Sequence, residues 1–382
     1  MARRTHLLAV AVSILTLTCI FYHHCYSSAS STFPLQQQSS ILPLANSTLG
    51  FGAILAVSHS SSPRRQSLLW AANLTDIEIV IPEQKEWTLG DIEELKAKES
   101  RLSPGSAKAW LGHLAVLRWF LASDYETALV MEDDTDFDIS IRHSQIPLLA
   151  SAVRSLLNNS DDDHTSYWAP SSAWDLLYPG HCDDLISTAY PSQPSLLYSD
   201  PTVPPHSVLH PDTALFLSFL SIPSKTRILH RSYWPFCTFA YAVNRRSATL
   251  ILSSFSQEPA GGSSAYDVAL LSACRDQDWK CWSVAPELFH HGLGESEIFK
   301  VDKAGQGKGE GNASKADARG TWNLWCGARH GQLWVDEAAG KKRRLVKNHV
   351  RSAIQRGACP IDKVMEERTW KGCEWGECGA QS

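Results

Sequence analysis

The chain has 382 residues and a formal net charge of -5 at pH 7, with 43% hydrophobic residues, 14 Trp and 12 Phe. This length and composition fit one large folded domain or two smaller ones, with enough apolar material for a core. The negative charge argues against nucleic acid as a partner, because binding to a phosphate backbone needs a basic surface.

The first 25 residues predict a segment directed to a membrane. Arg3 and Arg4 precede an apolar stretch from Leu7 to Tyr22, which is shorter than the roughly 20 residues of an average membrane span. This pattern is typical of a signal peptide, cleaved near Ala29, or of a short signal anchor. We favour the uncleaved anchor, which predicts a protein of the Golgi or endoplasmic reticulum membrane with its remaining residues in the lumen; cleavage would make the protein secreted.

Two further features support a lumenal location. Triplets that accept N-linked glycans begin at Asn46, Asn73, Asn158 and Asn312. Of the ten cysteines, two lie in or beside the apolar stretch and eight follow it, an even number that allows disulfides without fixing their connectivity. No cysteine pair has Cys-x-x-Cys spacing, so a structural zinc site is not expected.

Residues 26–48, rich in Ser, Gln and Pro, predict a flexible stem. Strands are then predicted at Gly52–Val57 and Ile77–Ile81, with a helix that opens at Pro63, and this order indicates a parallel unit. Arg64 and Arg65 are either surface charges of that helix or ligands of a nucleotide phosphate, which guanidinium matches in geometry.

A helix followed by a strand comes next. Ser103 and Pro104 suit the N-cap and first position of a helix whose apolar residues recur at helical spacing up to Ser123. The apolar run Ala128–Met131 predicts a buried strand, and five acids follow it: Glu132, Asp133, Asp134, Asp136 and Asp138. If the chain stays extended, Glu132, Asp134, Asp136 and Asp138 share one side and repel one another without a cation. Oxygen ligands of this kind suit Mg²⁺ or Mn²⁺, although an acidic run after a strand is also common as a solvated turn.

The block from Gly105 to Asp134, GSAKAWLGHLAVLRWFLASDYETALVMEDD, resembles the central block of glycosyltransferase family 25. Gly105, His113 and the triplet Glu132-Asp133-Asp134 match the family pattern. The sequence departs from that pattern at four positions: Ser106, Lys108, Ala109 and Gly112. With later segments, the likeness covers roughly residues 50 to 300.

Three later segments extend the resemblance. Trp174–Gly180 predicts a strand that resembles the family's Trp-Asp strand, and Asp175 either faces the site or caps the strand. Cys237–Leu252 predicts a strand that passes into a helix, and Asp267 lies at the start of a further helix, where the family also has Asp. A strand at Trp282–Pro286 precedes His290 and His291, of which at most one is expected to reach a metal, because adjacent residues of an extended chain point opposite ways.

The remaining segments are less informative. Pro191–Lys225 is rich in Pro and Ser and predicts a long loop with one or two helical turns. Residues 301–320 predict a disordered linker, and 321–382 a cysteine-containing extension in which the resemblance fades. Residues 49–300 are therefore the predicted glycosyltransferase domain.

The resemblance implies an α/β fold of the GT-A type, a Rossmann-like, mixed and mostly parallel sheet flanked by helices. It implies a glycosyltransferase that moves a sugar, with galactose suggested, from a UDP-sugar to a glycan or glycoprotein acceptor with inversion. Mn²⁺, or Mg²⁺, would be held by Asp134 with His290 or His291. The expected residues for binding the nucleotide sugar are Glu132, Asp133, His113, Arg64 and Arg65, and the candidate bases are Asp267 and then Asp175. A glycosidase, or an inactive sugar- or protein-binding scaffold, is the competing interpretation.

Overall fold

The computed structural model describes residues 35–36, 42–157, 166–182, 184, 193–206, 209–292, 298, 301–302 and 320–361. The chain divides into two compact units, Met1–Leu35 and Gln36–Ser382, and a two-residue strand, β1 (Leu35–Gln36), spans their boundary. The predicted anchor and most of the predicted stem and linker lie outside the described residues. Within those residues, no helix has the length and apolar character needed to cross a membrane.

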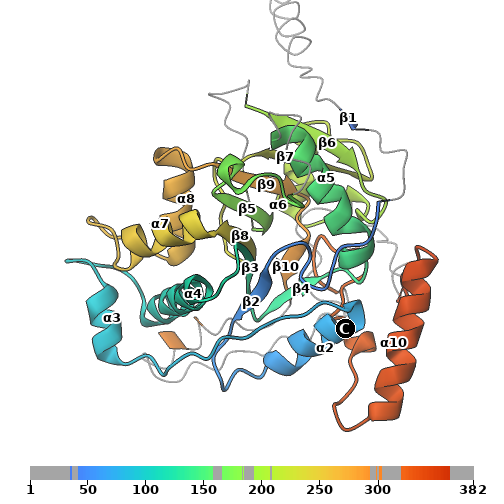
Figure 1. Ribbon diagram of the computed structural model, residues 1–382, viewed down its shortest axis with the longest axis horizontal. Helices are drawn as coiled ribbons and strands as arrows, with labels where there is room; N and C mark the ends of the chain where they lie inside the picture. Colours follow the sequence, from blue (N-terminus) through green and yellow to red (C-terminus); the bar gives the residue numbers. More distant parts are fainter. Residues whose placement is uncertain are drawn as a thin grey trace, which may run out of the picture. The chain divides into compact units, whose positions relative to one another are not determined.

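A mixed sheet forms the centre of the second unit (Figure 1). Its neighbouring strands are, in order, β6 (Ser195–Ser199), β7 (Thr226–Arg231), β9 (Cys281–Ala285), β5 (Leu176–Gly180), β8 (Ala240–Asn244), β3 (Thr127–Glu132) and β2 (Ala53–Val57). Strands β2, β3, β5, β6 and β9 run in one direction, and β7 and β8 run in the other. A separate antiparallel pair joins β4 (Thr135–Phe137) to β10 (Phe289–His291). The predicted α/β class, with a mixed sheet whose strands mostly share one direction, is confirmed.

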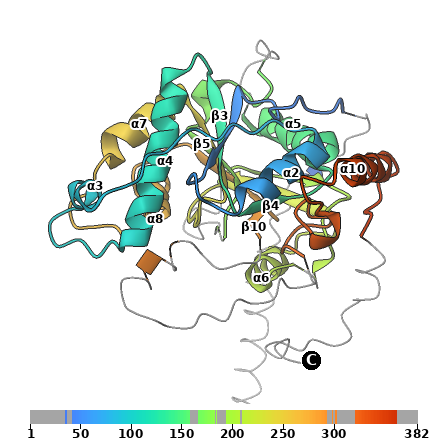
Figure 2. The same cartoon turned by 90° about the horizontal axis from the view of Figure 1, so that it is seen from below.

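Helices cover both faces of this sheet, and Figure 2 shows the two groups on opposite sides of the strands. One group comprises α3 (Leu89–Leu95), α4 (Pro104–Ala122), α7 (Arg245–Phe255) and α8 (Tyr266–Asp276), and the other comprises α2 (Arg65–Thr75), α5 (Ile146–Leu157) and α10 (Gly340–Gln355). Successive residues of a strand point to opposite faces, so Val130 packs with the first group and Leu129 with the second. A further helix, α6 (Pro211–Phe219), and short helical turns at Ile141–Gln145, Ser171–Ala173 and Gly331–Leu333 complete the described elements.

Helix α4 forms as its sequence predicts. The Ser103 hydroxyl accepts the Ser106 N–H at 3.1 Å, and Pro104 occupies the first turn, where its missing N–H costs nothing. The helix then packs closely on β2, because a Cβ added at Gly112 would lie 3.0 Å from Val57 Cγ1. Gly112 therefore serves packing of the helix against the sheet.

Two predicted segments differ in the structure. Ile77–Ile81 does not form a full strand; Val80 alone makes a parallel bridge, to Leu55. The segment 191–225 contains the predicted helical turns as α6, but it also contains a strand, β6, which was not predicted. Strand β6 has only five residues and pairs with β7 through its backbone. Its sequence does not indicate a strand, because the residues around it are rich in Pro and Ser.

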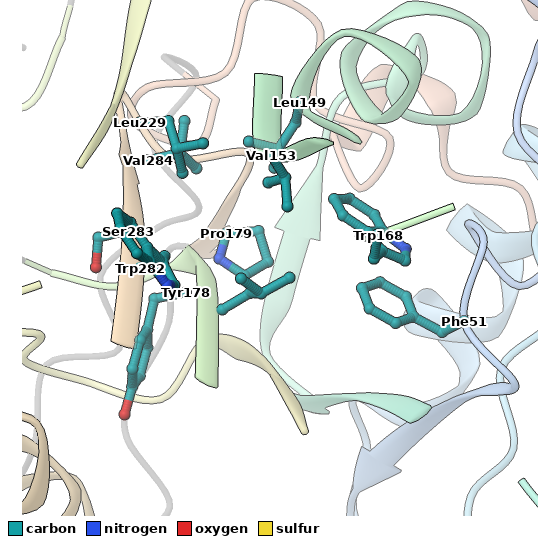
Figure 3. Close-up of a pocket in the computed structure, with 11 residues that line it drawn as sticks. Phe51, Leu149, Val153, Trp168, Tyr178, Pro179, Leu229, Trp282, Ser283 and Val284 are labelled. Atoms are coloured by element: carbon teal, nitrogen blue, oxygen red, sulfur yellow. The ribbon is translucent and has the colours of Figure 1, made fainter. Parts of the chain in front are cut away.

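A small apolar void of about 10 Å³ lies between α5 and the sheet. In Figure 3, Val153 of α5 lies near Trp168 and Phe51, whose rings stack with centroids 4.7 Å apart. A space this small and this apolar is at the limit for one water molecule and offers it few polar partners. We interpret it as imperfect packing, so the functional site lies elsewhere.

Three disulfides cross-link the described part of the second unit: Cys182–Cys237, Cys274–Cys281 and Cys326–Cys359. The last of these confirms that the C-terminal extension is held by a disulfide, and Cys373 and Cys378 lie outside the described residues. The extension packs against the group of helices that contains α2. Trp70 of α2 donates its indole N–H to the Leu333 carbonyl at 2.8 Å, and the Ile139 N–H bonds to the Cys326 carbonyl at 2.9 Å.

We expect Asp76→Asn to weaken the attachment of α10 to α2. Asp76 ends α2 in the left-handed conformation (φ 54°), which asparagine also adopts, so the exchange removes charge with little backbone strain. Burial raises the pKa of Asp76, but Arg351 and Lys347, at 2.8 and 2.9 Å, outweigh burial and lower the pKa from 3.8 to about 2. The stabilisation is therefore complete above about pH 4 and is lost as the pH falls toward 2.

Urea unfolding should show the Asp76→Asn variant to be less stable by about 1 to 2 kcal/mol at pH 7. The difference should disappear near pH 2. Glu337→Gln, at an exposed acid of the same extension, is the control and should change nothing. Equal stability of the Asp76→Asn variant and the wild type at pH 7 would contradict the assignment.

Candidate active site

The acidic triplet lies at the carboxyl edge of the sheet. Strands β2 and β3 are parallel neighbours, with Val57 opposite Glu132, so Ser58 and the triplet meet at the same edge. Strands β5 and β9 run in the same direction and end at that edge in Gly180 and Ala285. Ligands of open α/β sheets bind outside this edge.

After Glu132 the chain does not stay extended. It turns at Asp133 and Asp134 and then enters β4. The prediction that all the alternate acids share one side is therefore wrong. Asp136 and Asp138 are buried and accept hydrogen bonds from the C-terminal extension, Asp136 from the Arg329 N–H at 2.9 Å and Asp138 from the Cys326 N–H at 2.6 Å.

Glu132 belongs to a hydrogen-bonded network that begins on α4. Its carboxylate accepts the Thr238 hydroxyl at 2.7 Å and lies 3.5 Å from Nε2 of His113. The other ring nitrogen of His113 lies 3.1 Å from the Tyr241 hydroxyl, and its ring stacks on Tyr266 with centroids 4.6 Å apart. Burial raises the pKa of Glu132, but hydrogen bonds from His113 and Thr238 outweigh burial and leave the pKa below its usual value. Glu132 is therefore held as a carboxylate, and His113, which the sequence also places among the donor-binding residues, is in contact with it.

Asp133 is fixed by residues that follow β2. Its carboxylate accepts the Ser58 hydroxyl at 2.6 Å and lies 3.4 Å from the Arg64 guanidinium. Arg65 donates to the Ser58 hydroxyl at 3.1 Å and to the Ser58 carbonyl at 2.9 Å. The structure thus brings Arg64 and Arg65 to the acidic turn, Arg64 by direct ion pairing and Arg65 through Ser58.

Asp134 is the least compensated acid of the triplet. One carboxylate oxygen lies 3.4 Å from Arg64, and the other, Oδ1, is buried without a hydrogen-bond partner among the described residues. Burial and the charges of Glu132 and Asp133 raise its pKa to about 7 against the opposing effect of Arg64. Its side chain is 25% exposed, so a ligand can reach it from solvent.

This environment fits a hard divalent cation. Asp134 Oδ1 is a buried carboxylate oxygen without a hydrogen-bond donor among the described residues, in a cluster of three acids. A positive charge next to this oxygen would stabilise it. Within the described ranges, no group of three or more His, Cys, Asp or Glu side chains is arranged to hold a metal by itself. Asp134 supplies one oxygen without a partner in the described part of the chain, and a cation bound there would take its other ligands from outside such a group.

The two histidines have different surroundings. His290 and His291 lie on β10 opposite Asp136 and Thr135 of β4. His290 is buried, and its Nδ1 lies 2.6 Å from the Glu287 carboxylate. Burial and repulsion by His290 lower the pKa of His291, while Glu132 opposes both effects. His291 is therefore the one of the pair that the structure brings near Glu132.

Asp267 lies close to the same edge. It is in the first turn of α8 but is not the N-cap, a position that Ala265 occupies. One oxygen accepts the Cys237 N–H at 3.1 Å, and the other accepts the Val268 N–H at 2.9 Å. Burial and then the charge of Glu132 raise its pKa. A carboxyl group with a raised pKa beside the acidic turn suits a general base.

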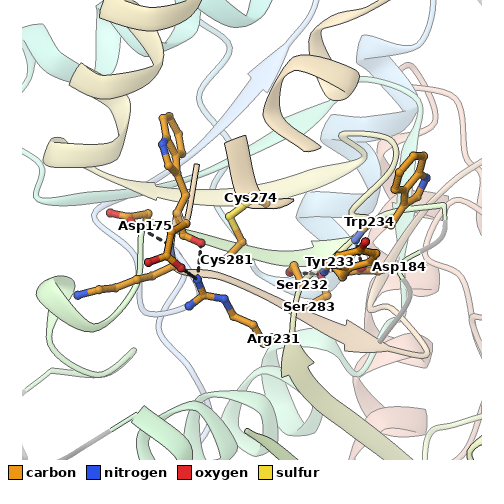
Figure 4. The surroundings of a disulfide bond; sticks show 12 residues. Asp175, Asp184, Arg231, Ser232, Tyr233, Trp234, Cys274, Cys281 and Ser283 are labelled. Carbon is orange, nitrogen blue, oxygen red and sulfur yellow. Dashed lines mark hydrogen bonds and ion pairs between the residues drawn. A yellow bond between two sulfur atoms is a disulfide. The ribbon is translucent and has the colours of Figure 1, made fainter. Parts of the chain in front are cut away.

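Asp175 lies at the wrong end of the sheet. It precedes Leu176, which is level with Ala128, so it is separated from Glu132 by about 13 Å or more along the strand direction. Its carboxylate forms an ion pair with Arg246 and accepts the Lys280 N–H at 2.9 Å. In Figure 4 it lies apart from the residues around Asp184. Asp175 caps the start of β5, and the prediction of Asp175 as a base is wrong.

No protein-family model matches the chain, and no curated protein matches it. Among the solved structures to which the chain is similar is that of a glycosyltransferase. That structure is of a glycosyltransferase involved in the glycosylation of the major capsid of PBCV-1, with 9% identity over 66% of this chain and 98% of that chain and a TM-score of 0.29. A likeness at this level carries no argument about activity.

Sequence analysis missed Arg329. Its guanidinium donates to the carbonyls of Asp133 and Thr135, both at 2.8 Å, and to the Ser67 hydroxyl at 2.6 Å. Arg329 therefore fixes the backbone of the acidic turn from the C-terminal extension. Nothing in the surrounding sequence indicates this role, because the contact joins residues 196 positions apart.

Proposed function

We propose that the protein is a metal-dependent glycosyltransferase that moves a sugar from a UDP-sugar to a hydroxyl group with inversion. The observation that carries this proposal is Asp134, a carboxyl group at the carboxyl edge of an α/β sheet whose Oδ1 has no hydrogen-bond partner among the described residues and whose pKa is raised to about 7. The family resemblance of the block around it supports the GT-A type, a UDP-sugar and galactose as the sugar.

The residues of the site take separate roles. Asp134 would hold Mn²⁺ or Mg²⁺, whose charge neutralises the UDP leaving group. Arg64, paired with the triplet, is placed to bind a phosphate oxygen, and Glu132 and Asp133 to bind the ribose or a metal-bound water. Asp267 accepts the proton of the acceptor hydroxyl as its oxygen attacks the anomeric carbon.

An inactive sugar- or protein-binding scaffold is the alternative, and the departures at Ser106, Lys108, Ala109 and Gly112 favour it. Two of these departures have structural roles. Gly112 packs on Val57, and the Ser106 hydroxyl accepts a hydrogen bond from the Ser103 hydroxyl at 3.1 Å. These contacts belong to the packing and start of α4, which leaves the transferase as the better-supported function.

The proposal includes the cellular compartment of the protein. Disulfides persist in oxidising compartments, so the three disulfides support a lumenal site in the Golgi or endoplasmic reticulum. Membrane attachment would come from the apolar segment within residues 1–25, and the acceptor would be a glycan or glycoprotein of the same compartment.

The test is release of UDP from UDP-galactose by the purified full-length chain, with Mn²⁺ or with a chelator. Release that requires the metal supports the transferase. Hydrolysis of aryl glycosides without any nucleotide would instead identify a glycosidase. Folded protein that shows neither release nor Mn²⁺-dependent binding of UDP would leave the scaffold as the function.

We expect Asp267→Asn to lower the rate of sugar transfer by about 10²-fold or more while UDP binding stays unchanged, because the amide cannot accept the proton. The amide oxygen can still accept one of the two N–H groups, that of Cys237 or that of Val268, and thermal unfolding of the variant checks that the start of α8 is preserved. Transfer kinetics and UDP titration calorimetry are the measurements. Asp276→Asn, at the exposed end of the same helix, is the control. A normal transfer rate in the Asp267→Asn variant would exclude Asp267 as the base.

A further inference from the structure

A pocket of about 470 Å³ opens beside the acidic turn, on the far side of β8. Its walls come from the end of β5, from α6, from Trp234 and from the end of β9, and its lining includes His181, Asp184, Phe216, Phe219 and Glu287. Gly180, just before His181, is level with Ala240 and so with Met131 on β3. Two strand spacings, roughly 10 Å, therefore separate His181 from Glu132. This volume is in the range of small-molecule sites.

His181 presents an unused hydrogen-bond acceptor to this pocket. The side chain is only 3% exposed, and its Nε2 lies 3.0 Å from the Val284 carbonyl. A carbonyl can only accept, so Nε2 carries the hydrogen, and in the tautomer with one ring hydrogen this leaves a lone pair on Nδ1. Nδ1 has no partner among the described residues.

Asp184 presents a second acceptor. It is 4% exposed, and its Oδ1 accepts the N–H groups of Tyr233 and Trp234 at 3.0 and 2.6 Å, as Figure 4 shows. Its Oδ2 is buried without a partner among the described residues. A buried acceptor without a donor costs free energy, so a ligand that donates hydrogen bonds gains from both His181 and Asp184.

Three aromatic side chains also line the pocket. Phe219 and Trp234 are 76% and 39% exposed, and Phe216 is half-buried with its ring centroid 5.7 Å from that of His230. Aromatic rings beside hydrogen-bond acceptors match a molecule with a flat apolar face and an edge of hydroxyl groups. A sugar ring in a glycoside has this form.

The pocket is also connected to the candidate base. Cys182 lines the pocket and forms a disulfide with Cys237, whose N–H bonds to Asp267 at 3.1 Å. The pocket therefore adjoins the segment that holds Asp267, as a site for the acceptor must.

We propose that this pocket binds the acceptor, and that the acceptor is a glycoside whose hydroxyl groups donate hydrogen bonds to His181 Nδ1 and Asp184 Oδ2. The inference rests on the proposed transferase function and adds the chemical class of its acceptor. An amine is the competing ligand, because carboxylates and aromatic rings also bind cations. Asp184 already accepts two backbone N–H groups, and the other acids of the lining have histidine partners, Glu287 with His290 at 2.6 Å and Asp212 with His210 at 3.5 Å. Hydroxyl donors therefore fit the site better than a single charge.

The test is saturation-transfer NMR of the full-length chain with para-nitrophenyl galactoside, glucoside, xyloside and mannoside, alongside calorimetry of UDP with Mn²⁺. We expect at least one glycoside to bind. Asp184→Asn should weaken that binding about tenfold or more, because the amide keeps the Oδ1 contacts and replaces Oδ2 with a hydrogen-bond donor. UDP affinity should not change.

Substitution of either of two exposed aromatic residues is not expected to destabilise the fold. Phe219→Ala should weaken glycoside binding, whereas Phe236→Ala, at a residue 37% exposed and outside the pocket lining, should not. If the Asp184→Asn variant failed to fold, this pair would still decide the question.

The outcomes separate the two proposals. If the protein binds UDP but no glycoside, the acceptor pocket is overturned and the proposed transferase function is not. The same holds if Asp184→Asn and Phe219→Ala leave glycoside binding unchanged. Binding of free lysine in place of the glycosides would overturn it in favour of a cation pocket. Glycoside binding by protein that shows no UDP binding would overturn the acceptor role together with the transferase.

Discussion

Replacement of Asp134 by asparagine is expected to reduce metal-dependent UDP release by about 10²-fold or more. An amide is a poor ligand for Mn²⁺ and carries no charge to oppose the cation. The same change is expected to raise the melting temperature at pH 8 in the absence of metal. Burial, Glu132 and Asp133 raise the pKa of Asp134 to about 7, so the charged group destabilises the folded protein, and the amide removes that cost.

The measurements are UDP release with Mn²⁺ and thermal unfolding with a chelator. Asp336→Asn, at an exposed acid of the C-terminal extension, is the matched control and should alter neither. Loss of activity together with a gain in stability is the combination expected of a functional carboxylate. UDP release at the wild-type rate would remove Asp134 from the active site.

Arg329→Met is expected to lower the free energy of unfolding by about 3 to 5 kcal/mol and to reduce UDP release even at temperatures where the variant is folded. Methionine fills much of the same space but donates no hydrogen bonds. The carbonyls of Asp133 and Thr135 would lose their donor, and the backbone of the acidic turn would lose its support. Asp134 would then no longer be held in one position.

Urea unfolding and UDP release at low temperature test this expectation. Arg344→Met is the control, because Arg344 is exposed on α10 and carries the same charge. A variant at Arg329 that unfolds normally and releases UDP normally would show that the extension does not support the site.

Much of the fold follows from local sequence patterns. The apolar runs predict β2 and β3, because a strand buried on both faces needs apolar residues at successive positions. The N-cap pattern at Ser103 predicts the start of α4. The position of the acidic triplet at the carboxyl edge also follows, since the triplet comes directly after a strand of an α/β sheet.

The rest of the site depends on contacts that no local pattern encodes. The turn after Glu132 removes Asp136 and Asp138 from the triplet, and their partners lie in the C-terminal extension. In the sequence, Asp175 lies just before a strand and Asp267 at the start of a helix, so the two look alike. Only the arrangement of the strands shows that they lie at opposite ends of the sheet. His181 and Asp184 become recognisable only when α6 and Trp234 close the pocket around them.

The dependence of the acidic turn on Arg329 has a consequence for biosynthesis. Residues 320–361 leave the ribosome after the whole sheet has been translated, so a nascent chain can pair β2 with β3 well before its turn is supported. Closing a contact across 196 residues is also entropically costly and slow. Formation of the Cys326–Cys359 bond would then fix the extension in place, and a chain terminated before residue 320 is expected to carry the acidic triplet without releasing UDP.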